Sequence, residues 1–229
     1  MIAAGFAASF RALIALAATV GLVIECVYGS VPVVLSFFTI WTNILVAVVF
    51  GLCAVRAWQR RPEPGPLWRG GVLLFILITG LVFHLVLDNP SSPFNVVEDL
   101  DKLSGARAVS NQLLHTVTPI AAALDFVLLT APRRLRPRHA AQWLAFPFLY
   151  LAFALVRGAL LAPGTKTRYT YPFIDVAEYG YARVAVNGLV LGLAFYALGL
   201  ALVTADRFRP ALLTPRENRI SSPADGPLK

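Results

Sequence analysis

The sequence predicts an all-α, polytopic membrane protein with six transmembrane helices and both termini in the cytoplasm. Its mean hydropathy is +0.70 and only 14% of its residues are charged, which is typical of integral membrane proteins. It also contains six apolar stretches of about 20 residues, the length that a helix needs to cross the hydrocarbon core of a bilayer. These stretches cover residues 6–28, 33–56, 70–88, 107–131, 141–161 and 180–205.

The six stretches use almost the whole chain, so we expect one six-helix transmembrane domain over residues 1–205. The remaining residues, 206–229, are rich in proline, arginine and serine and are predicted to form a disordered cytoplasmic tail. The first stretch could instead be a secretory signal sequence with Arg11 as its charged start. A transmembrane helix is favoured because the apolar run continues past Glu25 and no small-residue cleavage site precedes Pro32.

The basic and acidic residues alternate from loop to loop. A net charge of +8 could suggest nucleic-acid binding, but its distribution matches the positive-inside rule instead. Arginines cluster after the second, fourth and sixth stretches: Arg56, Arg60, Arg61, Arg69, Arg133, Arg134, Arg136, Arg138, Arg207, Arg209, Arg216 and Arg219. Acidic residues follow the third and fifth stretches: Asp88, Glu98, Asp99, Asp101, Asp175 and Glu178. We therefore expect a multi-pass protein of the plasma (inner) membrane, with membrane lipids and no nucleic acid as partners.

The connections between the stretches differ in length. A tight turn over residues 28–32 joins the first two, with Pro32 near the start of the next helix. The predicted outer loops, 89–106 and 162–179, are longer, and long loops often form lids or control ligand access. The alternative, which has equal weight, is that these two loops only connect helices. Cys26 and Cys53 fall at opposite ends of the predicted membrane domain and are not expected to pair.

Polar residues gather at one depth of the predicted membrane. With a rise of about 1.5 Å per residue, Thr39 lies ~9 Å and His115 ~12 Å below the outer surface, and His84 lies about one turn below it. The same layer contains Glu25, Asn43, Asp88, Asn111, Arg157 and Asn187. Such groups are costly in hydrocarbon, and these are confined to one leaflet. They predict a functional site that opens outward, or sideways into the outer leaflet.

Thr39 and His115 are the predicted catalytic pair. A threonine hydroxyl is a weak nucleophile until a base takes its proton, and a histidine at similar depth on a facing helix is the simplest base. Pro119 removes the helical hydrogen bond to the carbonyl of His115, so a kink is expected there. Helical spacing adds four supporting residues: Asn43, Asn111, His84 and Asp88. Of these, Asn43 or Asn111 could donate a hydrogen bond to a developing oxyanion.

Three non-catalytic interpretations compete with this one. In a membrane scaffold, the polar layer only joins helices, Glu25 and Arg157 pair or reach the interface, and Asp125 pairs with the basic inner loop. A transporter would need polar groups throughout the membrane depth. A zinc site could combine His84 and His115 with Asp88 or Glu25, but no ligand-pair motif is present, so no metal or cofactor is expected. The oligomeric state stays open.

Three short motifs resemble a known family. They are Phe38-Thr39-Ile40-Trp41-Thr42-Asn43, Asn111-Gln112-Leu113-Leu114-His115-Thr116 and Tyr171-Pro172-Phe173. In order and spacing they are similar to the androgen-induced membrane protein family and its bacterial relatives. The resemblance implies a six-span hydrolase of fatty acid esters of hydroxy fatty acids.

The resemblance also implies roles for two residues, with Thr39 as the nucleophile and His115 as its base. This chain departs from the animal members of the family at two places. Gln112 stands where they have a second histidine, and they lack the Trp41-Thr42-Asn43 segment. Thr42 is therefore a rival nucleophile, and we expect a lipid-like ester as substrate without specifying it further.

Overall fold

The computed structural model describes residues 2–210, and within them the chain forms helices and connecting segments only. The helices are α1 (Ile2–Tyr28), α2 (Val31–Val34), α3 (Phe38–Trp58), α4 (Pro66–Val82), α5 (Val97–Leu100), α6 (Gly105–Gln112), α7 (Thr118–Leu128), α8 (Pro137–Trp143), α9 (Ala145–Leu160) and α10 (Val176–Phe208). Two π-helical turns, η1 (Phe83–Leu87) and η2 (Leu113–Val117), and a 3₁₀ turn, η3 (Pro172–Ile174), complete them. The all-α prediction is confirmed.

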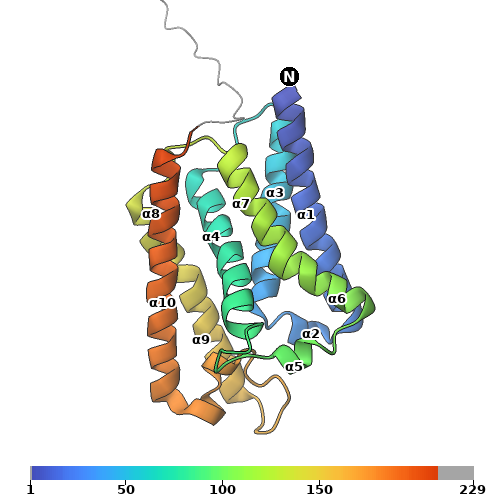
Figure 1. Ribbon diagram of the computed structural model, residues 1–229, viewed down its shortest axis with the longest axis vertical. Coiled ribbons are helices and arrows are strands. Elements are labelled where there is room, and N and C mark those ends of the chain that lie inside the picture. Colours follow the sequence, from blue (N-terminus) through green and yellow to red (C-terminus); the bar gives the residue numbers. More distant parts are fainter. Residues whose placement is uncertain (1, 211–229) are drawn as a thin grey trace, which may run out of the picture.

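Five helical segments are long and apolar enough to cross a membrane, which makes this a multi-pass membrane protein. They are Gly5–Tyr28, Phe38–Trp58, Pro66–Leu87, Pro137–Leu160 and Val176–Phe208. The predicted fourth span, 107–131, is not among them. It consists of α6, η2 and α7, which follow one another along the same side of the bundle (Figure 1). Polar residues such as Asn111, Gln112 and His115 make this segment less apolar than the five.

The bundle is organised around α4, the most buried of the five segments. On one side α1 packs along α3, and both contact the segment from α6 to α7; on the other side α10 packs against α8 and α4. Figure 1 shows these long helices side by side, with α2 and α5 near one end. Outward-facing positions carry large apolar side chains such as Leu13, Leu189 and Leu193, as expected for a surface that contacts lipid.

Two of the helix boundaries that differ from the sequence prediction affect the site and the tail. α3 begins at Phe38 rather than at residue 33, because Pro32 starts the separate short helix α2 and Phe37 has an extended backbone. Thr39 therefore lies in the first turn of α3. α10 continues through Phe208, so residues 206–208 belong to this helix and not to the tail. Residues 211–229 of the predicted tail lie outside the described residues.

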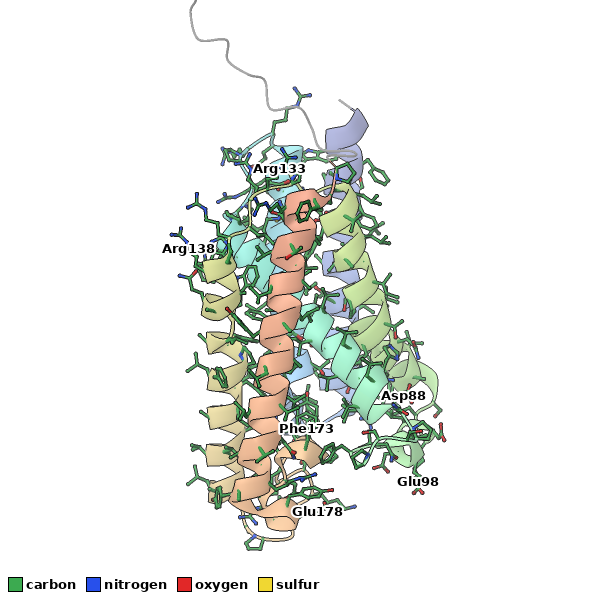
Figure 2. All side chains as sticks on the ribbon, turned by 60° about the vertical axis from the view of Figure 1, so that its left-hand side comes forward. Asp88, Glu98, Arg133, Arg138, Phe173 and Glu178 are labelled. Carbon is green, nitrogen blue, oxygen red and sulfur yellow. The ribbon has the colours of Figure 1, made fainter. Side chains whose placement is uncertain are left out.

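Charged side chains distinguish the two ends of the bundle. Arg133 and Arg138 lie at one end and Asp88, Glu98 and Glu178 at the other (Figure 2). We call the first the basic end and the second the acidic end, although the acidic end also carries basic residues. This separation agrees with the alternation in the sequence.

A buried ionic network closes the basic end. The Arg11 guanidinium, 1% exposed, donates to the Asp125 carboxylate (2.7 Å) and to the carbonyl of Leu129 (3.2 Å). Arg69 donates to the other Asp125 oxygen (3.1 Å), and Glu63 pairs with both arginines. The expected pairing of Asp125 with the basic end is confirmed. Arg11 is not an exposed charge before an apolar run, because it joins α1 to α7 and to Glu63 in the connection before α4.

Candidate active site

Thr39 and His115 meet inside the bundle. The Oγ1 atom of Thr39 lies 3.1 Å from Nε2 of His115, although 76 positions separate the two residues in the chain. Thr39 is 8% exposed. Because Thr39 lies in the first turn of α3, it is beside the positive end of a 21-residue helix. The pairing expected from equal depth is present. The Thr39 hydroxyl contacts His115 and Tyr171 and not a backbone carbonyl in the preceding turn.

The His115 ring is fixed on its other side. Its Nδ1 lies 3.1 Å from the carbonyl oxygen of Asn111, which can only accept, so Nδ1 carries a proton and donates. Nε2 of a neutral ring is then the acceptor that faces the Thr39 hydroxyl. The Phe83 ring stacks on the imidazole at 4.1 Å between centroids and 22° between planes. Both contacts hold the ring in the orientation that a general base needs.

Tyr171 completes the polar contacts of Thr39. Its hydroxyl oxygen accepts from the backbone N–H of Thr39 (3.3 Å) and lies 3.4 Å from Oγ1. One proton arrangement satisfies all contacts: Tyr171 donates to Oγ1, Oγ1 donates to His115, and His115 donates to Asn111. Burial raises the pKa of Tyr171, so the phenol keeps its proton and stays a donor at neutral pH.

The loop that carries Tyr171 is anchored on α9. Thr170 shares a hydrogen bond (2.8 Å) with the Tyr150 hydroxyl, which also donates to the carbonyl of Ser36 (2.9 Å). Tyr169 lies flat against Gly158, where an added Cβ would come within 2.2 Å of its ring. Gly158 is therefore required for this close approach.

Arg157 anchors the same loop rather than pairing with Glu25. Its guanidinium donates to the carbonyls of Thr167 (2.8 Å) and Arg168 (3.1 Å). Glu25 instead accepts from Ser110 and lies 3.9 Å from Arg107. Of the two alternatives in the scaffold interpretation, the Glu25–Arg157 pair is therefore not formed, because each residue has closer partners.

The rival nucleophile Thr42 faces another way. It is completely buried, donates to the carbonyl of Thr39 (3.0 Å) and shares a hydrogen bond with Thr79 (2.8 Å). Asn43 is also completely buried: its amide donates to the carbonyls of Thr39 (2.9 Å) and Leu114 (3.2 Å). Both side chains therefore join helices, and the geometry gives neither of them a free donor for an oxyanion.

The other supporting residues do not gather around Thr39. His84 is exposed on the outside of the bundle and pairs through Nε2 with the Thr116 hydroxyl (3.1 Å). Asp88 is exposed at the end of η1, and Asn111 contributes its backbone carbonyl. Among residues 2–210, no group of three His, Cys, Asp or Glu side chains is arranged to hold a metal ion. Cys26 and Cys53 are both free, as expected.

Both histidines of the predicted layer lie in π-helical turns. His84 is in η1 and His115 is in η2, which ends one residue before α7 begins at Thr118. The distortion expected near Pro119 is present and takes the form of a π-helical turn, a feature frequent at functional sites.

An apolar pocket extends from the Thr39–His115 pair. It lies among α3, α4, η1, η2, α9, α10 and η3, and its cavity volume is about 80 Å³. Its walls are almost entirely hydrocarbon and aromatic side chains. Thr39, His115 and the Tyr171 hydroxyl form its polar end. A pocket with apolar walls and one polar end suits a ligand in which a polar reacting group is attached to an apolar chain.

The predicted site residues include only two that line the pocket, Thr39 and His115. Tyr171, Tyr150 and the walls from α9 and α10 were not among the predicted site residues. The Tyr171-Pro172-Phe173 segment in a long outer loop was the available signal, and the structure brings it to Thr39. Asn187, predicted only as part of the polar layer, donates to the carbonyl of Phe173 (2.9 Å) and fastens this segment to α10.

Compared with known proteins, the chain matches no family model, no curated protein and no solved structure.

Proposed function

We propose that this protein is a membrane-embedded hydrolase of lipid-like esters, with Thr39 as the nucleophile and His115 as the general base. The observation that carries the proposal is the 3.1 Å contact between Thr39 Oγ1 and His115 Nε2 at the polar end of an apolar pocket. The resemblance of the three sequence motifs to the androgen-induced membrane protein family supports the same assignment independently of the coordinates.

The proposed reaction has two halves. In the first, His115 Nε2 takes the Thr39 proton as Oγ1 attacks the ester carbonyl, and the tetrahedral oxyanion accepts hydrogen bonds from Tyr171 and the Thr39 N–H. Collapse breaks the ester bond, and the alcohol leaves with the proton that His115 returns. In the second half, His115 deprotonates a water that attacks the acyl-threonine, which releases the acid and restores Thr39.

The proposal includes a location and a topology. We place the basic end in the cytoplasm, as the positive-inside rule requires, with six spans, both termini inside and the chain in the plasma (inner) membrane. In this arrangement the segment from α6 to α7 is the fourth of the six spans. The pocket then lies in the outer leaflet, where lipid-like substrates and water are both within reach.

A transporter is less well supported. Asp125 is a buried acid near the basic end, and a conduction path that used it would need it to be accessible. It is 1% exposed and bonded to Arg11 and Arg69. Its charge is neutralised by these contacts, so it offers no free site for an ion.

Covalent labelling tests the dyad. We expect an alkyl fluorophosphonate to label the purified protein in detergent, and His115→Ala to slow labelling by about 10²–10⁴-fold, the usual contribution of a general base. His84→Ala is the matched control, because that histidine pairs with Thr116 outside the pocket. Equal labelling of His115→Ala and the wild type would refute the proposed base.

Tyr171→Phe tests the oxyanion donor. The phenylalanine keeps the ring contacts with Phe37 and Phe173 but removes the hydroxyl. We expect kcat for a p-nitrophenyl ester to fall by about 10²–10³-fold, as when one oxyanion donor is removed elsewhere. Tyr181→Phe, at an exposed tyrosine of α10, should leave kcat unchanged. A kcat for Tyr171→Phe equal to that of the wild type would exclude this role.

A further inference from the structure

We infer that the gap between α9 and α10 holds the acyl chain of the substrate and limits its length, a conclusion that rests on the proposed ester hydrolysis. The pocket is lined from these helices by Leu144, Phe148, Leu151, Gly188, Gly192 and Phe195. None of these side chains carries a polar group. An alcohol or headgroup would leave its polar atoms unpaired here, whereas an acyl chain would not.

The pocket extends from Thr39 toward the basic end. Tyr150 contacts Phe38, next to Thr39, and so marks the level of the nucleophile on α9. Leu144, immediately before α9, is the pocket residue nearest the basic end on that helix. Phe195 is the pocket residue nearest the basic end on α10. Six residues separate Leu144 from Tyr150, which corresponds to about 9 Å of helix.

This length corresponds to a medium acyl chain. With C–C bonds of about 1.5 Å, an extended hydrocarbon chain advances about 1.25 Å per carbon, so about 9 Å accommodates roughly seven or eight carbons. Leu144 and Phe195 then form the floor of the pocket. A longer chain must displace them or leave the pocket.

Two glycines make the space between the helices. A Cβ added to Gly192 would lie 3.3 Å from Cζ of Phe148, and one added to Gly188 would lie 3.2 Å from Cδ2 of Leu151. A larger side chain at either position therefore narrows the gap. Phe148 lines the pocket and is also 50% exposed on the outside of the bundle. The pocket consequently opens sideways between α9 and α10, where an acyl chain can come directly from the surrounding lipid.

Hydrolysis of p-nitrophenyl acetate, octanoate and hexadecanoate by the purified full-length protein tests the inference. We expect the highest kcat/KM with octanoate. Gly192→Leu should lower kcat/KM for octanoate relative to acetate by about tenfold or more, since each lost contact with a methylene costs a measurable factor. Ala194→Leu places a leucine on the exposed face of α10 instead and should leave the ratio of octanoate to acetate kcat/KM as in the wild type.

Phe195→Ala provides a second arm that does not depend on the stability of Gly192→Leu. By opening the floor, it should raise kcat/KM for hexadecanoate relative to octanoate. Two results together overturn the inference while acetate turnover still depends on Thr39. In the first, Gly192→Leu has the same ratio of kcat/KM for octanoate to kcat/KM for acetate as Ala194→Leu. In the second, Phe195→Ala has the same ratio for hexadecanoate to octanoate as Ala194→Leu. Acetate turnover that is equal in Thr39→Ala and the wild type instead removes the proposed function itself.

Discussion

Thr39→Ala should abolish ester hydrolysis, with a fall in kcat/KM of roughly 10⁴–10⁶-fold, the scale seen when a hydrolase loses its nucleophile. The alanine removes the hydroxyl that lies 3.1 Å from the imidazole at the polar end of the pocket. Thr39→Ser restores a hydroxyl at the same place and should recover measurable turnover. Initial rates with p-nitrophenyl octanoate in detergent provide the measurement.

Thr42→Ala is the matched control for this prediction. Thr42 is three residues away on the same helix, and its hydroxyl is engaged with the Thr39 carbonyl and Thr79. We expect activity per folded molecule to be retained, with some loss of stability from the unpaired Thr79 hydroxyl. The opposite pattern, in which Thr42→Ala is inactive and Thr39→Ala is active, would transfer the nucleophile to Thr42.

Asp125→Ala should have the largest effect on stability. It leaves the Arg11 guanidinium without its fully buried partner, and breaking a buried ion pair from one side costs about 3–5 kcal/mol of unfolding free energy. Arg69 loses a contact with the same carboxylate, although Glu63 remains for both arginines. Reversible unfolding in mixed micelles gives the free-energy difference.

Asp99→Ala is the comparison for Asp125→Ala. Asp99 pairs with Lys102 at 3.0 Å on the surface, and both side chains are more than 70% exposed. Such a pair contributes at most about 1 kcal/mol. Similar losses for the two variants would show that the network at the basic end does not hold α1, α4 and α7 together.

The fold could be predicted from the sequence because it depends on length and hydropathy. Long apolar runs separated by arginine clusters require membrane-crossing helices, whichever residues later pack together. Hydropathy could not show that α6, η2 and α7 would form the remaining segment with a π-helical turn in it. Nor could it show that Arg11 is buried, because its partners Asp125 and Glu63 come from distant parts of the chain.

The site could be predicted in part. Depth along each helix depends on residue count alone, and it placed Thr39 and His115 close enough to be paired. Rotation about the helix axis depends on packing, so depth could not show that Asn43 joins helices or that His84 lies outside the pocket. The approach of Tyr171 depends on a loop held by Arg157, Gly158 and Asn187, and none of these contacts follows from local sequence patterns.

Mass-spectrometric peptide mapping of the fluorophosphonate-treated protein identifies the residue that acts as nucleophile. The phosphonyl group remains on the atom that attacked it, so fragmentation of the labelled peptide identifies the nucleophile. We expect a single adduct on Thr39 that is missing from Thr39→Ala. An adduct on Thr42, on Thr116 or on any residue outside the pocket, with Thr39 unmodified, would contradict it.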